Sequence, residues 1–168
     1  MPTVMRGAVR ALPAAALAAL ALAGCGSSGP APSRVAACAS QVKSGVLPPW
    51  ARTGFSDPRP RMPYEVGRAG DIAAIVWVFP LLSPPPRTHN NKILWVSRVT
   101  LQPGSDLRIA AQRMHGTHPL GTPVSRTVTG GPGPSIIDLP ASGCWRLTLR
   151  WSGRMDSLDL DYVANPDA

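Results

Sequence analysis

Residues 144–151, with the sequence CWRLTLRW, alternate between apolar and polar side chains without a break. Successive side chains of a β-strand point to opposite faces, so this period of two predicts a strand with one buried and one solvent-facing side. A helix would need apolar residues every three to four positions, and the segment therefore directs the chain to a β fold. The expected inward residues are Trp145, Leu147, Leu149 and Trp151, and the outward ones are Cys144, Arg146, Thr148 and Arg150.

A second alternating segment follows at residues 158–163, LDLDYV. Residues 151–157 turn the chain between the two segments, which predicts a C-terminal hairpin. We expect Arg146 and Arg150 to face the two aspartates across its solvent side, where each such pair contributes roughly 0.2–1 kcal/mol. In the second strand the expected inward residues are Leu158, Leu160 and Tyr162, and the outward ones are Asp159 and Asp161.

Five further segments have the composition of strands and lie between turn signals. Seven strands, with no helical period beyond the N-terminal leader, predict an all-β chain folded as an antiparallel, immunoglobulin-like β-sandwich. A small β-barrel is the alternative architecture. The five segments are residues 72–79, 92–99, 106–112, 124–129 and 134–139.

The first 24 residues have the organisation of a secretory signal peptide. Two arginines precede an apolar run that is shorter than the roughly 20 residues of a membrane-spanning helix. Residues 22–25, LAGC, resemble the lipobox of bacterial lipoproteins. The resemblance implies that Cys25 becomes the lipidated first residue of the mature protein and anchors it in the cell membrane on the extracytoplasmic face. An ordinary secreted protein, cleaved near Ala23, is the alternative.

Composition divides the rest of the chain into a tether and a domain. Residues 25–46 are expected to hold the lipidated cysteine and a flexible tether, because they are mostly small and polar with prolines. The β-sandwich domain is expected over residues 47–168. Its first part, residues 47–70, is rich in proline and predicts an extended arm laid over the domain. Its aromatic residues Trp50, Phe55 and Tyr64 are candidate points of attachment.

Two cysteines remain once Cys25 is lipidated. An even pair in an oxidising compartment favours a disulfide between Cys38 and Cys144. Two free thiols or an intermolecular bridge are the alternatives.

The mature chain is basic. Removal of residues 1–24, which carry two arginines and no acidic residue, lowers the formal net charge from +8 to +6. Arginine greatly outnumbers lysine, and this bias is typical of high-GC genomes, so we do not interpret it as a sign of nucleic-acid binding. An exported basic surface would instead attract anionic lipid headgroups or anionic wall polymers.

The strand residues support a wider resemblance. GCWRLTLRW, LDLDYV and the upstream NNKILWV are similar to segments of uncharacterised Gram-positive, actinobacterial extracytoplasmic lipoproteins with an immunoglobulin-like domain. The resemblance spans roughly residues 47–163. It implies the fold and the cellular address, and it supplies no catalytic residues.

The search for metal ligands gives only weak candidates. His115 and His118 are three residues apart in an expected loop, whereas a closed metal site needs four ligands and no cysteine or carboxylate lies near in sequence. Asp156, Asp159 and Asp161 are a loose calcium candidate, although strand alternation explains the last two as solvent-facing. We therefore expect no metal and no cofactor.

No catalytic set emerges either. Ser135 lacks the G-x-S-x-G turn of a nucleophilic serine. Glu65 is the only glutamate, which leaves scattered aspartates as partners for glycoside chemistry. His89 is expected to be a loop residue rather than a base.

The sequence thus predicts a non-enzymatic, membrane-anchored domain that binds a protein or an anionic polymer of the cell envelope. One alternative is a cell-envelope enzyme, which requires a histidine among His89, His115 and His118 to share a cleft with an aspartate. The other is a carbohydrate-binding module, which requires Trp or Tyr rings exposed in a row.

Overall fold

The computed structural model describes residue 38 and residues 40–168. The expected signal peptide, Cys25 and most of the expected tether lie outside the described residues. Within the described part, no helix is long and apolar enough to cross a membrane.

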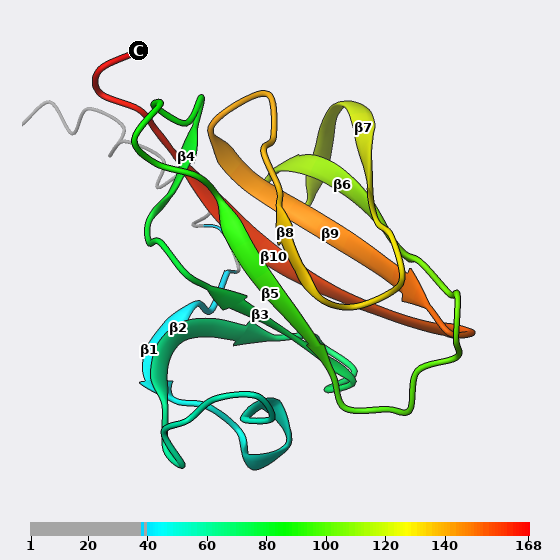
Figure 1. Cartoon of the computed structure of the whole chain (residues 1–168). Coiled ribbons are helices and arrows are strands. Elements are labelled where there is room, and N and C mark those ends of the chain that lie inside the picture. The colour runs from blue at the N-terminus through cyan, green and yellow to red at the C-terminus, as the bar shows by residue number, and fades with distance from the viewer. Residues whose placement is uncertain (1–37, 39) are drawn as a thin grey trace, which may run out of the picture. The chain divides into compact units, whose positions relative to one another are not determined.

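The described chain folds into two five-stranded sheets (Figure 1). The first sheet has the order β1 (Lys43–Val46), β2 (Arg61–Val66), β3 (Ile72–Val76), β5 (Lys92–Ser97) and β8 (Pro134–Ile136). The second has the order β4 (Leu81–Ser83), β10 (Arg154–Ala164), β9 (Gly143–Trp151), β6 (Leu107–His115) and β7 (His118–Val128). A short 3₁₀ helix, η1 (Pro49–Ala51), follows β1.

This architecture confirms the prediction of an all-β sandwich. All seven expected strands are present, and β1, β2 and β4 add to them. The pairing is antiparallel except between β4 and β10, which run parallel. Consecutive strands β3 and β4 belong to different sheets, so the chain crosses from one layer to the other between residues 76 and 81.

Two expected boundaries were wrong at the N-terminal side. Residues 43–46 were expected in the tether but form β1, because their backbone pairs with residues 61–64 of β2. The proline-rich arm is likewise part of the sheet over residues 61–66, and Pro63 is accommodated there next to the edge strand β1.

Two other strands differ in length from the expectation. The segment 72–79 is a strand only to Val76, and Trp77, Val78 and Phe79 follow it on the surface. The segment 124–129 is the second half of β7, which begins at His118 and pairs with β6 along its length.

The β9–β10 hairpin is tighter than the sequence indicated. Its turn is only Ser152 and Gly153, at φ 44° and 70°. Two successive residues with positive φ are typical of a two-residue turn whose twist matches that of the flanking strands. Trp151 therefore pairs directly with Arg154, and the register continues to Tyr162 opposite Gly143.

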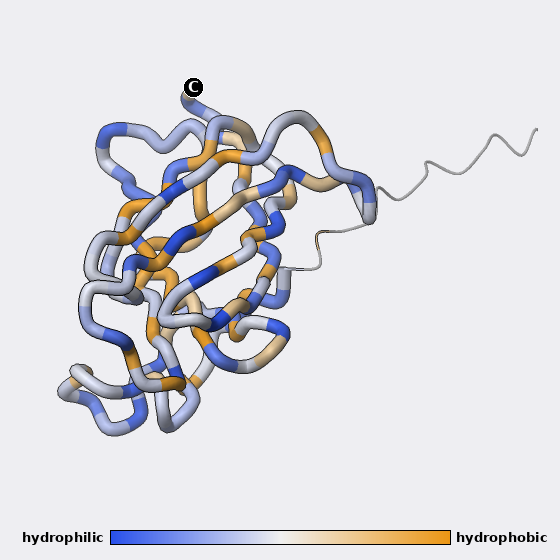
Figure 2. The backbone as a smooth tube through the Cα atoms, turned by 90° about the vertical axis from the view of Figure 1, so that its right-hand side faces the viewer, coloured by the Kyte–Doolittle hydropathy of each residue, from blue (hydrophilic) through white to orange (hydrophobic). Residues whose placement is uncertain are grey.

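The main core lies between the two sheets. It includes every residue expected to face inward in β9 and β10. Figure 2 shows the underlying alternation of hydrophobic and hydrophilic residues along neighbouring strands. The sequence pattern thus identified the buried face of the hairpin correctly.

A second, smaller core lies around Tyr64 and Ala73, which point away from the main core. Trp50 and Phe55 of the arm are partly buried against it, so the three aromatic residues attach the arm as expected. With apolar neighbours on both faces, all five residues of β3 are buried. This double coverage explains why IAAIV is continuously apolar instead of alternating.

Cys38 and Cys144 form a disulfide, with their Cα atoms 5.0 Å apart. The bridge links the start of the described chain to the second residue of β9, and its two cysteines are 106 residues apart in the sequence. Closing a loop of that size stabilises the fold by roughly 4–5 kcal/mol in the chain-entropy account. The expected pairing is confirmed.

We expect Leu147→Ala to lower the free energy of unfolding by about 2–5 kcal/mol, because it leaves a cavity in the main core. Its neighbour Thr148→Ala, on the opposite face of β9, is expected to change it by less than about 0.5 kcal/mol. Urea unfolding of the two variants measures the difference. Equal losses at both positions would contradict the register of β9.

Candidate functional site

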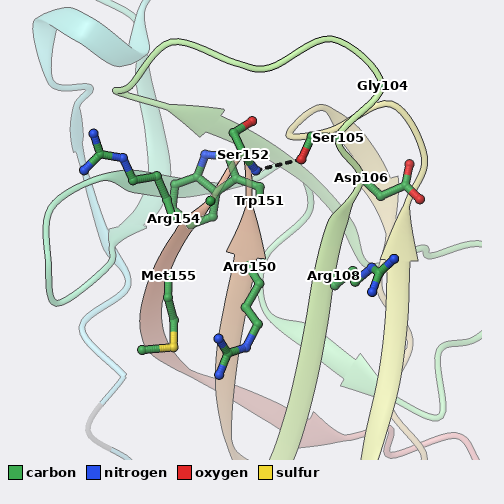
Figure 3. A pocket seen from close by; sticks show the side chains of 10 residues that line it. Gly104, Ser105, Asp106, Arg108, Arg150, Trp151, Ser152, Arg154 and Met155 are labelled. Atoms are coloured by element: carbon green, nitrogen blue, oxygen red, sulfur yellow. Dashed lines mark hydrogen bonds between the residues drawn. The ribbon is translucent and has the colours of Figure 1, made fainter.

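Two arginines are cross-strand neighbours on the outer side of the second sheet. Arg108 of β6 and Arg150 of β9 are direct cross-strand partners, and both side chains are exposed. They line an open hollow of about 430 Å³ together with residues 104–106 and 151–155. We call it the arginine hollow. Figure 3 shows the guanidinium groups of Arg108 and Arg150 pointing apart, that of Arg108 toward β7 and that of Arg150 away from it.

The hairpin register leaves these arginines without acidic partners. Arg150 lies opposite Met155 rather than an aspartate, and Arg108 lies opposite Thr127 on its other side. Within the described residues, both ion pairs involve Asp159, far along β10 from the hollow. Like charges directly opposite one another are unfavourable for folding, and within the described residues no ion pair offsets the repulsion between Arg108 and Arg150.

The loop at the mouth of the hollow is held firmly. The backbone N–H of Ser152 donates to Ser105 Oγ at 2.7 Å, and that of Gln102 donates to Ser152 Oγ at 2.9 Å. Asp106 is the acidic residue of the hollow, and its Oδ1 accepts a hydrogen bond from the backbone N–H of Gly130 at 3.0 Å. Three arginines against one engaged carboxylate leave the hollow positive.

Asp159 contradicts the expectation that it faces solvent. It is 1% exposed, because Arg146 and Arg68 cover it with nitrogens 3.0 Å and 2.8 Å from its carboxylate oxygens. Burial raises the pKa of its carboxyl, but the hydrogen bonds and positive charges of the two arginines outweigh burial and lower it. The expected pairing with Arg146 is confirmed, whereas Asp161 lies opposite Cys144, not an arginine.

Glu65 is a second buried carboxylate close to Asp159. It accepts hydrogen bonds from Ser40 Oγ at 3.0 Å and from the backbone N–H of Gln41 at 2.9 Å. Burial is the main cause that raises its pKa, and the negative charge of Asp159 adds to the rise. The two carboxylates therefore have pKa values shifted in opposite directions.

The carboxylate of Asp156 holds a turn in place through hydrogen bonds to backbone N–H groups. Its carboxylate accepts hydrogen bonds from the backbone N–H groups of Ala69, Asp71 and Ser157 at 2.8, 3.1 and 2.7 Å. The backbone of Gly67 lies so close to this carboxylate that any side chain there would collide with it. Asp156 thus fastens the turn after β2 to β10, and the three candidate calcium ligands have three separate environments.

The candidate histidines do not assemble a site. His115 and His118 are paired across the β6–β7 turn and both are exposed. His89 lies in the connection between β4 and β5, with Nε2 buried and unpaired. Among the residues that the structure describes, no three His, Cys, Asp or Glu side chains gather as metal ligands. Ser135 Oγ accepts a hydrogen bond from Trp95 Nε1 at 3.0 Å.

The aromatic residues divide between core and surface. Trp145 and Trp151 are 3% and 2% exposed, which excludes them as a stacking platform for sugar rings. Trp77 and Phe79 are exposed, although the apolar segment 72–79 predicted that both belong to a strand. The apolar run IAAIVWVF continues past the end of the strand, so only Pro80 signalled a change.

The pairing of Arg108 with Arg150 was also missed. The outward position of Arg150 was predicted, whereas no prediction was made for the face on which Arg108 lies. Their proximity depends on the pairing of β6 with β9, which are separated by β7 and β8 in sequence. No local sequence signal carries that information.

The chain matches no protein-family model, no curated protein and no solved structure.

The buried carboxylates predict a dependence of stability on pH. Asp159 has a folded-state pKa below its ordinary value of 3.8, so its contribution is present above that pH and is lost as the pH falls through the folded value. We expect Asp159→Asn to lower the free energy of unfolding by about 1–3 kcal/mol at neutral pH. We also expect it to reduce the acid-induced loss of stability that thermal melts measure below pH 3.8.

Glu65→Gln is the matched control because it keeps the shape and the acceptor oxygen. The raised pKa of Glu65 destabilises the fold at neutral pH, and this effect is relieved as the pH falls toward its ordinary value of 4.5. The variant should therefore be at least as stable as the parent at pH 7. A stability loss of equal size in both variants would contradict the opposite shifts.

Proposed function

We propose that this protein is a lipid-anchored, extracytoplasmic domain that binds an anionic polymer of the cell envelope in the arginine hollow. The observation that carries the proposal is the pair Arg108 and Arg150, placed side by side without acidic partners. The lipobox-like segment at residues 22–25 supports the address. The net charge of +8, which becomes +6 without residues 1–24, supports an anionic partner.

The chemistry of the hollow suits phosphate or carboxylate groups. Guanidinium groups present N–H donors in a planar fork that matches both anions, and charge-assisted hydrogen bonds are about twice as strong as neutral ones. A bound anion would also reduce the electrostatic repulsion between the two arginines, which is present when the hollow is empty. The hydroxyls of Ser105 and Ser152 line the same hollow but already take part in the loop.

The open form of the hollow favours a polymer over a small substrate. It lies on the outer face of a sheet, and its floor is made by strands β6 and β9. An extended chain with repeated anionic groups can lie across such a face and place one group on each of the two arginines. Release and rebinding along the polymer would then require no opening of the fold.

We expect the double variant Arg108→Gln, Arg150→Gln to bind inorganic polyphosphate at least about tenfold more weakly, since a hydrogen bond to a charged group contributes about 1.5–3 kcal/mol. Binding of the parent should also weaken with added salt, because the site is exposed. Sedimentation with purified cell-wall polymer, polyphosphate and a polyuronate measures the affinity and separates phosphate from carboxylate ligands.

The matched control is Arg59→Gln, Arg61→Gln, which removes the same charge at exposed positions of the first sheet and the loop before it. This control should retain most of the parent's affinity. Equal losses in the two double variants would reduce the binding to general charge attraction and overturn the arginine hollow as the site.

The anchor is tested separately. We expect Cys25→Ala to abolish metabolic labelling of the protein by a fatty-acid analogue, because the thiol is the group that carries the lipid. Cys38→Ala is the control, since it removes a cysteine that pairs with Cys144 and should leave labelling intact. Labelling that persists in Cys25→Ala would overturn the lipid anchor.

A further inference from the structure

Three consecutive apolar residues stand on the surface directly after β3. Trp77, Val78 and Phe79 are 46%, 40% and 53% exposed. We call them the aromatic loop. A contiguous exposed apolar run of this kind marks a surface that contacts another apolar phase or partner, because leaving it in water is unfavourable.

The aromatic loop lies near Cys38, the first described residue after the proposed anchor at Cys25. Phe79 lines a hollow of about 280 Å³ together with Cys38, Val42 and Val163, and Ser40 and Asp161 are its polar lining residues. The disulfide to Cys144 fixes Cys38 in that place. Only 13 residues lead from Cys25 to Cys38, so at about 3.6 Å per residue the two are at most roughly 45 Å apart in any conformation.

From these observations we propose that the aromatic loop inserts into the membrane interface and orients the domain on the bilayer. Tryptophan and other aromatic side chains are enriched at the level of lipid headgroups, where the ring is buried and its polar edge stays hydrated. Lys92 supports this occupant, since its Nζ lies 5.0 Å from the centre of the Trp77 ring and would meet anionic headgroups beside it. This inference rests on the proposed lipid anchor at Cys25.

The arginine hollow lies at the other end of β9 from the disulfide. Cys144 is bonded to Cys38, which lines a hollow with Phe79. Cys144 and Arg150 are six residues apart on β9, which is about 20 Å along a strand. Figure 1 shows the β9–β10 turn at the opposite end of the second sheet from β4 and the C-terminus. A domain that rests on the bilayer through the aromatic loop therefore presents its arginine hollow away from the membrane, toward envelope polymers.

The test uses the tryptophan itself as a depth probe. The full-length lipidated protein is reconstituted into vesicles of phosphatidylglycerol and phosphatidylethanolamine, with and without brominated acyl chains that quench fluorescence on contact. Trp95, Trp145 and Trp151 are buried in the core, so quenching is expected to come mainly from Trp77. We expect Trp77→Phe to lose quenching severalfold, while Phe keeps a ring against Phe55, whose centroid lies 6.4 Å away.

Trp50→Phe is the matched control, because Trp50 is partly buried against the second core and should contribute little quenching. Flotation of the same vesicles reports the anchor independently. Protein that floats without quenching, or with equal quenching in both variants, overturns the inference and leaves the anchor standing. Protein that does not float overturns the anchor and the inference together.

Discussion

The register of the β9–β10 hairpin is the constraint on which most of the structure depends. The Ser152-Gly153 turn is so short that Trp151 must pair with Arg154, and every pair behind it is then fixed. This register places Leu147 beside Leu158 in the core and Arg146 beside Asp159 on the outer face. A shift by one residue would turn each strand over and bury its charged side.

The two sheets are held together by polar contacts at one edge as well as by the core. Asp156 accepts three backbone hydrogen bonds that fasten the turn after β2 to β10, and Arg68 of that turn pairs with Asp159. These carboxylates are buried yet satisfied, which is the condition for a buried polar group to support a fold. The disulfide adds a covalent link at the start of β9. The β9–β10 hairpin is therefore linked both to the turn after β2 and to the start of the described chain.

The β9–β10 hairpin also relates the two proposed surfaces to each other. The same short turn that aligns Arg146 with Asp159 aligns Arg150 with Met155, and Arg150 therefore has no aspartate opposite it on β10. The aromatic loop arises at the other end, where the chain leaves β3 and crosses to β4 in the other sheet. A binding surface and a membrane contact at opposite ends of one strand pair suit a domain that works between a bilayer and the polymers outside it.

The sequence by itself determined the class of fold, the seven main strands and the inward face of β9 and β10, because a period of two follows from local chain geometry alone. It also favoured the pair Cys38 and Cys144, which the structure confirms. Only the tertiary structure decided that Asp159 is covered, that Trp77 and Phe79 are exposed, and that Arg108 meets Arg150. Each of these depends on which distant segment lies against a face, and that is set by the packing of strands far apart in the chain, which no local pattern encodes.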